Sequence, residues 1–146
     1  RAADGHYLVS AGYGETFARS ILSEETGESV GDWPRDPIPV RDGLSCAGVL
    51  CRYAAHGRRV LIAVGAVPLP LDCRGVDAIV ARARTGRECR ALVPVVDRID
   101  VWRRGAVALW LGPGGVTLES ADEIRGARPW VPRSSPRRRR PPDHPF

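Results

Sequence analysis

The segment Val60-Leu-Ile-Ala-Val-Gly-Ala-Val67 decides the fold class of this chain. It is the longest apolar run in the sequence and has the length of a strand, far short of the ~20 residues that cross a bilayer as a helix. Because almost all of its side chains are apolar, both faces of this strand should be covered, as in a sheet with helices on each side. The segment therefore predicts an α/β layered domain.

Strands and helices alternate outward from this segment. Before it, we expect a strand at His6–Ser10, a helix at Glu15–Glu25, a proline-containing loop over residues 28–43 and one strand at Leu44–Tyr53. After it, we expect strands at Val76–Ala81, Leu92–Val96, Ala106–Leu111 and Val116–Ser120, a basic loop at Arg82–Arg90, and a helix capped by Asp97 and ended by Gly105. This order predicts a mixed sheet with short covering helices, with Trp102 and Trp110 in the packing.

The composition is typical of a globular domain, with 43% apolar and 27% charged residues. All 22 basic residues are Arg, and a GC-rich genome is the simplest explanation. The net charge of +5 is concentrated near the end of the chain, at Arg133 and Arg137–Arg140. The overall pI therefore says little about the charge of the folded part.

The last residues differ in composition from the rest. Residues 132–146 are rich in Pro and Arg, cannot bury apolar surface, and should be a disordered tail after a domain at residues 1–131. In this tail the run Arg137–Arg140 could contact anionic lipid or the DNA backbone, or have no partner, and the sequence does not choose between these options.

Four cysteines indicate the compartment. Cys46, Cys51, Cys73 and Cys89 are even in number and irregularly spaced, and none has the two-residue gap of a zinc knuckle. This pattern favours two disulfides over a metal site or buried thiols, and disulfides persist outside the reducing cytosol. Of the three possible pairings we favour Cys46–Cys51 with Cys73–Cys89, because each joins the nearest cysteines in the sequence.

The first residues are polar and mixed, residue 1 is Arg, and the chain has no Met. We interpret the chain as a piece of a longer protein and expect export and membrane signals in the rest of that protein. We expect the piece itself to be soluble, without a transmembrane segment.

Several short motifs occur in an order that resembles a known family. They are Arg41-Asp-Gly-Leu-Ser-Cys46, Gly57-Arg-Arg-Val-Leu-Ile-Ala63, Leu71-Asp-Cys73, Asp77-Ala-Ile-Val80, Val95-Val-Asp-Arg98 and Arg125-Gly-Ala-Arg-Pro-Trp130. Their joint order and spacing resembles the C-terminal end of the ComEC competence proteins, the inner-membrane DNA-uptake channels of bacteria. The similarity is greatest to the α-proteobacterial branch and spans roughly residues 5–131.

The resemblance implies a fold and a site. The C-terminal segment of that family resembles the second half of a metallo-β-lactamase fold, in which an Asp after one strand and a His-His-Gly-Ser turn after the next help to hold metal ions. Here Ala66 follows the first matching strand, and Ala81-Arg-Ala-Arg84 follows the second. Alanine has no donor atom and arginine stays protonated, so we expect no catalytic residue, metal ligand or cofactor in this chain.

The resemblance also implies a role. Our first hypothesis is a non-catalytic domain on the periplasmic side of a DNA-uptake channel, where it guides single-stranded DNA. Its partners would be the membrane-channel part of the same parent protein and the DNA, with no small-molecule substrate. The alternatives are a metal-dependent phosphodiesterase whose ligands lie in an upstream half, and a purely structural cap on the channel.

The basic loop supplies the candidate DNA contacts of the folded part. A guanidinium group matches a phosphate with two parallel hydrogen bonds. The sequence favours a solvated loop in an arginine-rich chain, but this loop lies where an active relative would hold metal, so a phosphate site without metal is an alternative. The candidate nucleic-acid contacts are Arg82, Arg84, Arg87 and Arg90 in the loop, and Arg137, Arg138, Arg139 and Arg140 in the tail.

Overall fold

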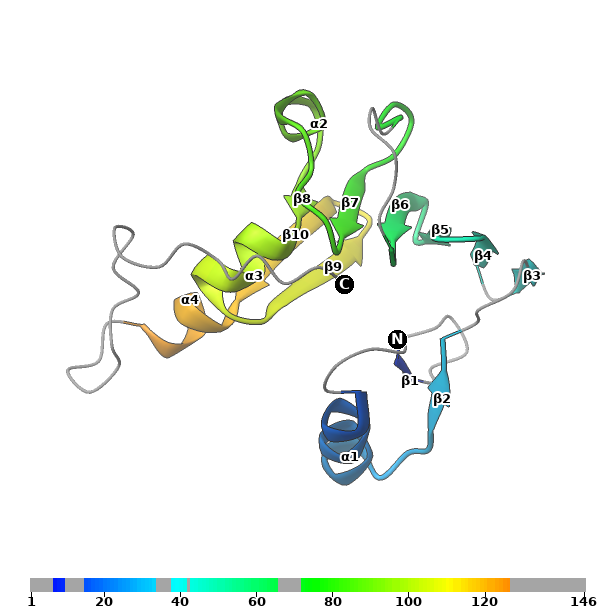
Figure 1. Cartoon of the computed structure of the whole chain (residues 1–146), viewed down its shortest axis with the longest axis vertical. Helices are drawn as coiled ribbons and strands as arrows, with labels where there is room; N and C mark the ends of the chain where they lie inside the picture. The colour runs from blue at the N-terminus through cyan, green and yellow to red at the C-terminus, as the bar shows by residue number, and fades with distance from the viewer. Residues whose placement is uncertain (1–6, 10–14, 34–37, 42, 66–71, 127–146) are drawn as a thin grey trace.

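The computed structural model describes residues 7–9, 15–33, 38–41, 43–65 and 72–126 (Figure 1). The strands are β1 (Tyr7–Val9), β2 (Val30–Asp32), β3 (Ile38–Arg41), β4 (Leu44–Ala47), β5 (Leu50–Ala55), β6 (Arg58–Ala63), β7 (Ala78–Ala81), β8 (Val95–Val96), β9 (Val107–Gly112) and β10 (Gly115–Ser120). The helices are α1 (Glu15–Thr26), α2 (Arg87–Leu92), α3 (Arg98–Arg104) and α4 (Ala121–Arg125).

A mixed sheet with the order β3-β4-β5-β6-β7-β8 forms the centre of the fold. The strands β3 to β6 pair antiparallel, whereas β6, β7 and β8 pair parallel. Outside this sheet, β9 and β10 form an antiparallel hairpin, and β1 and β2 form a parallel pair beside α1 (Figure 1). The mixed α/β class predicted from the apolar segment at Val60 is therefore confirmed.

One face of the parallel strands carries the main core. The register aligns Leu61, Ile79 and Val95, and all three side chains are buried. Cys73 and Cys89 pack on them, and because Cys89 lies in α2, this helix is fixed on the sheet. We call this side of the sheet the α2 face.

The opposite face is less completely covered. There the register aligns Ile62, Val80 and Val96, of which Val96 is buried and the other two are half-buried. Ile62 and Val80 each line two cavities, one toward α3 and one toward β9. Side chains on this face therefore remain within reach of molecules that enter from solution.

The two disulfides join Cys46 to Cys51 and Cys73 to Cys89, which confirms the pairing favoured from sequence. The prediction of one strand over Leu44–Tyr53 is wrong, because the chain reverses there and forms the hairpin β4–β5. Gly48 takes a positive φ of 59° in the turn, and Cys46 and Cys51 lie directly opposite each other across the two strands.

Other boundaries also differ from expectation. The expected loop over residues 28–43 contains β2 and β3, because proline at position 39 is tolerated in a strand at the end of a sheet. The basic loop is cut short by α2, and the third parallel strand is reduced to Val95–Val96.

Trp102 and Trp110 are 38% and 60% exposed, so the prediction that they lie in the packing is wrong. The predicted tail lies outside the described residues.

Arg58 ties the β9–β10 hairpin to the sheet. Its Nε donates to the carbonyl of Gly112 at 3.4 Å, its Nη2 donates to the carbonyl of Pro113 at 2.8 Å, and its Nη1 forms an ion pair with Asp77 at 3.4 Å. The Asp77 carboxylate also accepts the Arg59 amide at 2.8 Å, and this hydrogen bond is the main cause of its lowered pKa.

We expect Arg58→Gln to loosen the hairpin and to lower the free energy of unfolding by about 1 kcal/mol, the usual net contribution of a hydrogen bond such as the one to the Pro113 carbonyl. Amide hydrogen exchange should accelerate at β9 and β10 but not at β7. Arg87→Gln removes the same charge far from the hairpin and should leave the exchange rates unchanged. Equal acceleration across the whole sheet would contradict a local role for Arg58.

Candidate functional site

A cavity of about 870 Å³ opens where the parallel strands β6, β7 and β8 end. Its floor is apolar and includes Ile62, Val80 and Val96, and the first residues of α3 close one side. Because the carboxyl ends of parallel strands meet at one edge of a sheet, the segments that follow them converge there, and ligands bind at such edges in many α/β folds.

Three arginines line this cavity, and we call it the arginine cavity after them. Arg82 and Arg84 follow β7, and Arg98 follows β8 as the first residue of α3. All three are exposed, and none of the described residues that line the cavity is acidic. Like charges that converge without a nearby carboxylate raise the local positive potential, so this cavity favours anions.

The three guanidinium groups differ in their contacts. Arg82 Nη1 donates to the carbonyl of Val64 at 3.5 Å, which keeps this side chain near the end of β6. Within the ranges that the structure describes, neither Arg84 nor Arg98 forms an ion pair. These two side chains can therefore turn toward an anion without breaking an internal salt bridge.

One wall of the arginine cavity is apolar and partly open to solvent. It is formed by Val101 and Trp102 on α3, which are 47% and 38% exposed. An exposed indole beside guanidinium groups can pack flat against a planar group such as a nucleobase. The cavity thus combines positive charge with an apolar surface.

Asp97 fixes the two segments that carry these arginines. Its side chain is fully buried, its Oδ2 accepts the Thr85 amide at 2.9 Å, and its Oδ1 accepts the Ile99 amide at 2.8 Å as the cap of α3. Arg90 Nη2 forms an ion pair with Asp97 Oδ2 at 2.6 Å. One carboxylate therefore connects the segment after β7, the start of α3 and the helix α2.

The contacts of Asp97 set its charge. Burial raises the pKa of this carboxyl, but the hydrogen bonds from the Thr85 amide, the Arg90 guanidinium and the Ile99 amide outweigh burial and leave the pKa below its usual value. The cap predicted from sequence is confirmed, including the end of the helix at Gly105, where φ is 74°. The same carboxylate also holds Thr85, which local sequence reasoning did not anticipate.

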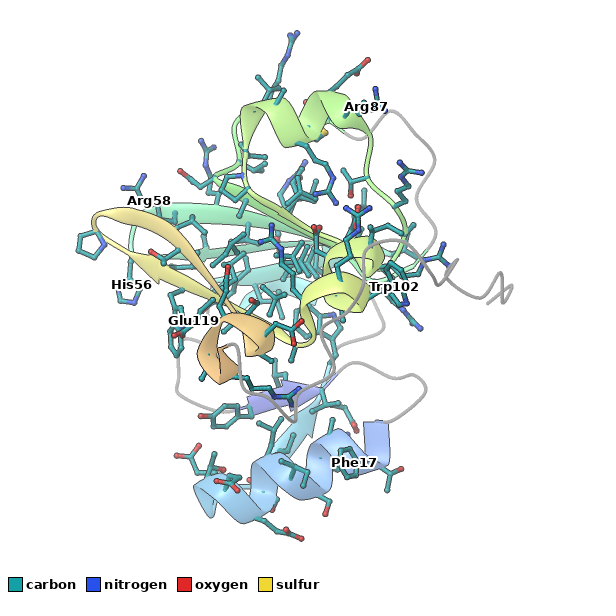
Figure 2. The ribbon with its side chains drawn as sticks, turned by 90° about the vertical axis from the view of Figure 1, so that its left-hand side faces the viewer. Phe17, His56, Arg58, Arg87, Trp102 and Glu119 are labelled. Atoms are coloured by element: carbon teal, nitrogen blue, oxygen red, sulfur yellow. A yellow bond between two sulfur atoms is a disulfide. The ribbon has the colours of Figure 1, made fainter. Side chains whose placement is uncertain are left out.

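The structure separates the four candidate arginines of the basic loop. Arg82 and Arg84 line the cavity. Arg87 lies at the start of α2, well away from Trp102 of the cavity wall (Figure 2). Arg90 makes ion pairs with Asp97 and Asp100, at 2.6 and 2.7 Å, and does not line the cavity. The four candidates in the tail, Arg137–Arg140, lie outside the described residues.

Sequence reasoning missed Arg98 as a site residue. The available signal was its position two residues after the third parallel strand, at the same sheet edge as Arg82 and Arg84.

Among the described residues, no group of three or more His, Cys, Asp or Glu side chains is arranged to hold a metal ion, and no helix is long and apolar enough to cross a membrane.

Comparisons with protein-family models, with curated proteins and with solved structures find no match for this chain. The resemblance to the ComEC family therefore stays a prediction from the short motifs. The arginine cavity is the feature of the chain from which a function can be proposed.

Proposed function

We propose that this chain is a non-catalytic domain of a ComEC-like DNA-uptake channel, and that the arginine cavity contacts the phosphate backbone of entering single-stranded DNA. The observation that carries the proposal is the convergence of Arg82, Arg84 and Arg98 at the end of three parallel strands. Guanidinium groups bind phosphate through two parallel hydrogen bonds, and such contacts are independent of base sequence.

The apolar wall supports a single strand rather than a duplex. In a single strand the bases are accessible, and an exposed indole such as Trp102 can stack on one of them while neighbouring arginines hold phosphates. In a duplex the base faces are covered by their neighbours, so the indole would have no base face on which to stack.

The parallel strand ends also support the likeness to the second half of a metallo-β-lactamase fold, because that fold holds its metal ions near such ends. The donor set does not fit metal. The described lining offers three guanidinium groups, which stay protonated, and no carboxylate, imidazole or thiolate side chain. The proposed role is therefore to bind and guide DNA, with no metal-dependent step.

The two disulfides support a place outside the reducing cytosol, and the periplasmic side of the channel is the place we propose. Entering DNA would pass this side before it reaches the membrane part of the parent protein. Strand guidance there needs weak, sequence-independent contacts, which an arginine cavity provides.

The test is the binding of a fluorescent oligothymidylate, followed by anisotropy over a series of salt concentrations. We expect Arg84→Gln to weaken binding about fivefold to tenfold and to lower the slope of log affinity against log salt by about 0.7, the value for one lost phosphate contact on a single strand. Arg87→Gln removes the same charge outside the cavity and should change neither quantity appreciably.

Two results would count against the proposal. If Arg84→Gln and Arg87→Gln weakened binding equally, general charge rather than the cavity would attract DNA. If the unaltered protein bound no oligonucleotide at low salt, the structural-cap hypothesis would take its place.

A further inference from the structure

Another cavity, of about 410 Å³, lies on the α2 face of the sheet and, like the arginine cavity, is lined by three arginines. Arg52 comes from β5, Arg59 from β6, and Arg74 from the segment that leads to β7. None of the three lines the arginine cavity, which opens at the other end of β6. We call the group Arg52, Arg59 and Arg74 the second arginine site.

The register of the sheet brings the first two arginines together. Arg52 lies opposite Leu61, and Ala54 lies opposite Arg59, so Arg52 and Arg59 are diagonal neighbours on one face. Diagonal neighbours in an antiparallel pair lie about 7–8 Å apart, which is within the reach of two long side chains. Ser45, directly opposite Arg52 on β4, adds a hydroxyl to the same lining.

A fixed turn brings the third arginine. The Asp72 carboxylate accepts the Arg74 amide at 3.1 Å, and Cys73 between them is buried in its disulfide with Cys89. The Arg59 guanidinium reaches this turn, because a Cβ atom at Gly75 would lie 3.9 Å from Arg59 Nη2. The disulfide and the turn therefore hold the backbone at Arg74 close to the Arg59 side chain.

The charge of this lining is not balanced. Against three guanidinium groups the described lining holds one carboxylate, that of Asp72. The nearby carboxylate of Asp77 is engaged by Arg58 and by the Arg59 amide. Among the described residues, none of the arginines of the second site forms an ion pair. Like charges held together in this way are unfavourable until an anion binds between them.

We propose that the second arginine site binds a phosphate group, separately from the arginine cavity. Donors that arrive from two strands and a turn approach from different directions, which suits the tetrahedral oxygens of phosphate better than the two coplanar oxygens of a carboxylate. Because the turn is held by a disulfide, little ordering is needed on binding. The phosphate comes either from a free ion or from the backbone of a nucleic acid.

The experiment uses the full chain and calorimetric titration with inorganic phosphate, against a chloride titration of equal ionic strength. We expect saturable phosphate binding that Arg59→Gln weakens at least about fivefold, as expected for the loss of one charge-assisted hydrogen-bond pair. Arg87→Gln, which removes the same charge outside both cavities, should retain it. Arg59→Lys keeps the charge but not the two-pronged geometry, and should bind with intermediate affinity.

A parallel titration with oligothymidylate separates the two sources of phosphate. If Arg59→Gln also weakens oligonucleotide binding, the site holds a nucleic-acid backbone, whereas unchanged oligonucleotide binding identifies a free phosphate ion as the ligand. The proposal is overturned if phosphate binding does not saturate, or if Arg59→Gln and Arg87→Gln bind phosphate equally. Arg52→Gln serves as the second variant, and the circular dichroism of each variant reports its folding. The proposed DNA contact at the arginine cavity is tested separately, by the effect of Arg84→Gln on oligothymidylate binding, and its outcome does not depend on these phosphate titrations.

Discussion

Replacement of Asp97 by alanine should lower the free energy of unfolding by about 3 kcal/mol, measured by urea denaturation. The variant loses the cap of α3, which contributes about 1 kcal/mol. It also leaves the Thr85 amide without its acceptor and Arg90 without one of its two partners, and hydrogen bonds to a charged group contribute about 1.5–3 kcal/mol each. Arg90 is one-third exposed and keeps Asp100, which limits the total cost.

The contribution of Asp97 should depend on pH in one direction. The pKa of this carboxyl in the folded protein lies below the ordinary value of 3.8, so its stabilising effect is fully present above about pH 4. It is lost as the pH falls from there through the folded pKa, because protonation then occurs more readily in the unfolded chain.

Asp97→Asn removes the titration, since the amide does not ionise, although it keeps only one of the two oxygen acceptors. The difference in stability between the unaltered protein and Asp97→Asn should shrink below pH 4. Asp77 and Glu123 also have lowered pKa values, but they are present in both proteins and cancel in the comparison. Parallel stability curves for the two proteins down to pH 3 would contradict this account. Asp122→Asn, the same exchange at a carboxylate away from Asp97, serves as the control, and its stability relative to the unaltered protein should not change in this way below pH 4.

The second large effect should come from the Cys73–Cys89 disulfide. It closes a loop with a sequence separation of 16, and chain entropy predicts about 3 kcal/mol for such a loop. The double variant Cys73→Ala and Cys89→Ala should lose at least this much, because both side chains are also buried against Leu61 and Ile79. The measurement is the free energy of unfolding in urea under oxidising conditions.

The Cys46–Cys51 disulfide provides a matched control. Its sequence separation is 5, and it joins residues that already lie opposite each other in the β4–β5 hairpin. The same entropy relation predicts about 2 kcal/mol for this shorter loop. A larger loss from the Cys46→Ala and Cys51→Ala double variant than from the first pair would show that loop closure is not the main source of the stabilisation.

The sequence predicted those features that local chemistry determines. The apolar run at Val60 marked the central strand, the side chain of Asp97 marked the start of α3, and proximity along the chain favoured the observed cysteine pairs. Each of these depends on residues that are close together in the sequence. Periodicity, capping and loop closure act at that scale, so they leave a readable pattern.

Other features are not predicted, in two cases although the sequence carries a local signal. The alternation of residues predicts one strand where the structure has the hairpin β4–β5, and Gly48 is the local signal of the turn. The helix α4 was missed although Ser120 and Glu123 form a capping box with the spacing that marks a helix start. The short helix α2 has no side-chain cap, and it is held by Cys89 in the core rather than by its own sequence.

The two arginine-lined cavities show the same limit for the candidate sites. Arg82 and Arg84 could be singled out because they follow a strand together. Arg98 required the knowledge that β7 and β8 are parallel neighbours, and Arg52 and Arg59 required the register between β5 and β6. In an arginine-rich chain, composition does not mark a site, so only the pairing of strands distinguishes converging arginines from solvated ones.

The ends of the central sheet have a consequence for how copies of this chain meet. A terminal strand with unpaired amide and carbonyl groups can recruit the terminal strand of another molecule and so start aggregation. Here β3 contains Pro39, which has no amide hydrogen to offer, and β8 at the other end has only two residues, Val95 and Val96. Both ends of the central sheet are thus poor templates for the strand of a neighbouring chain.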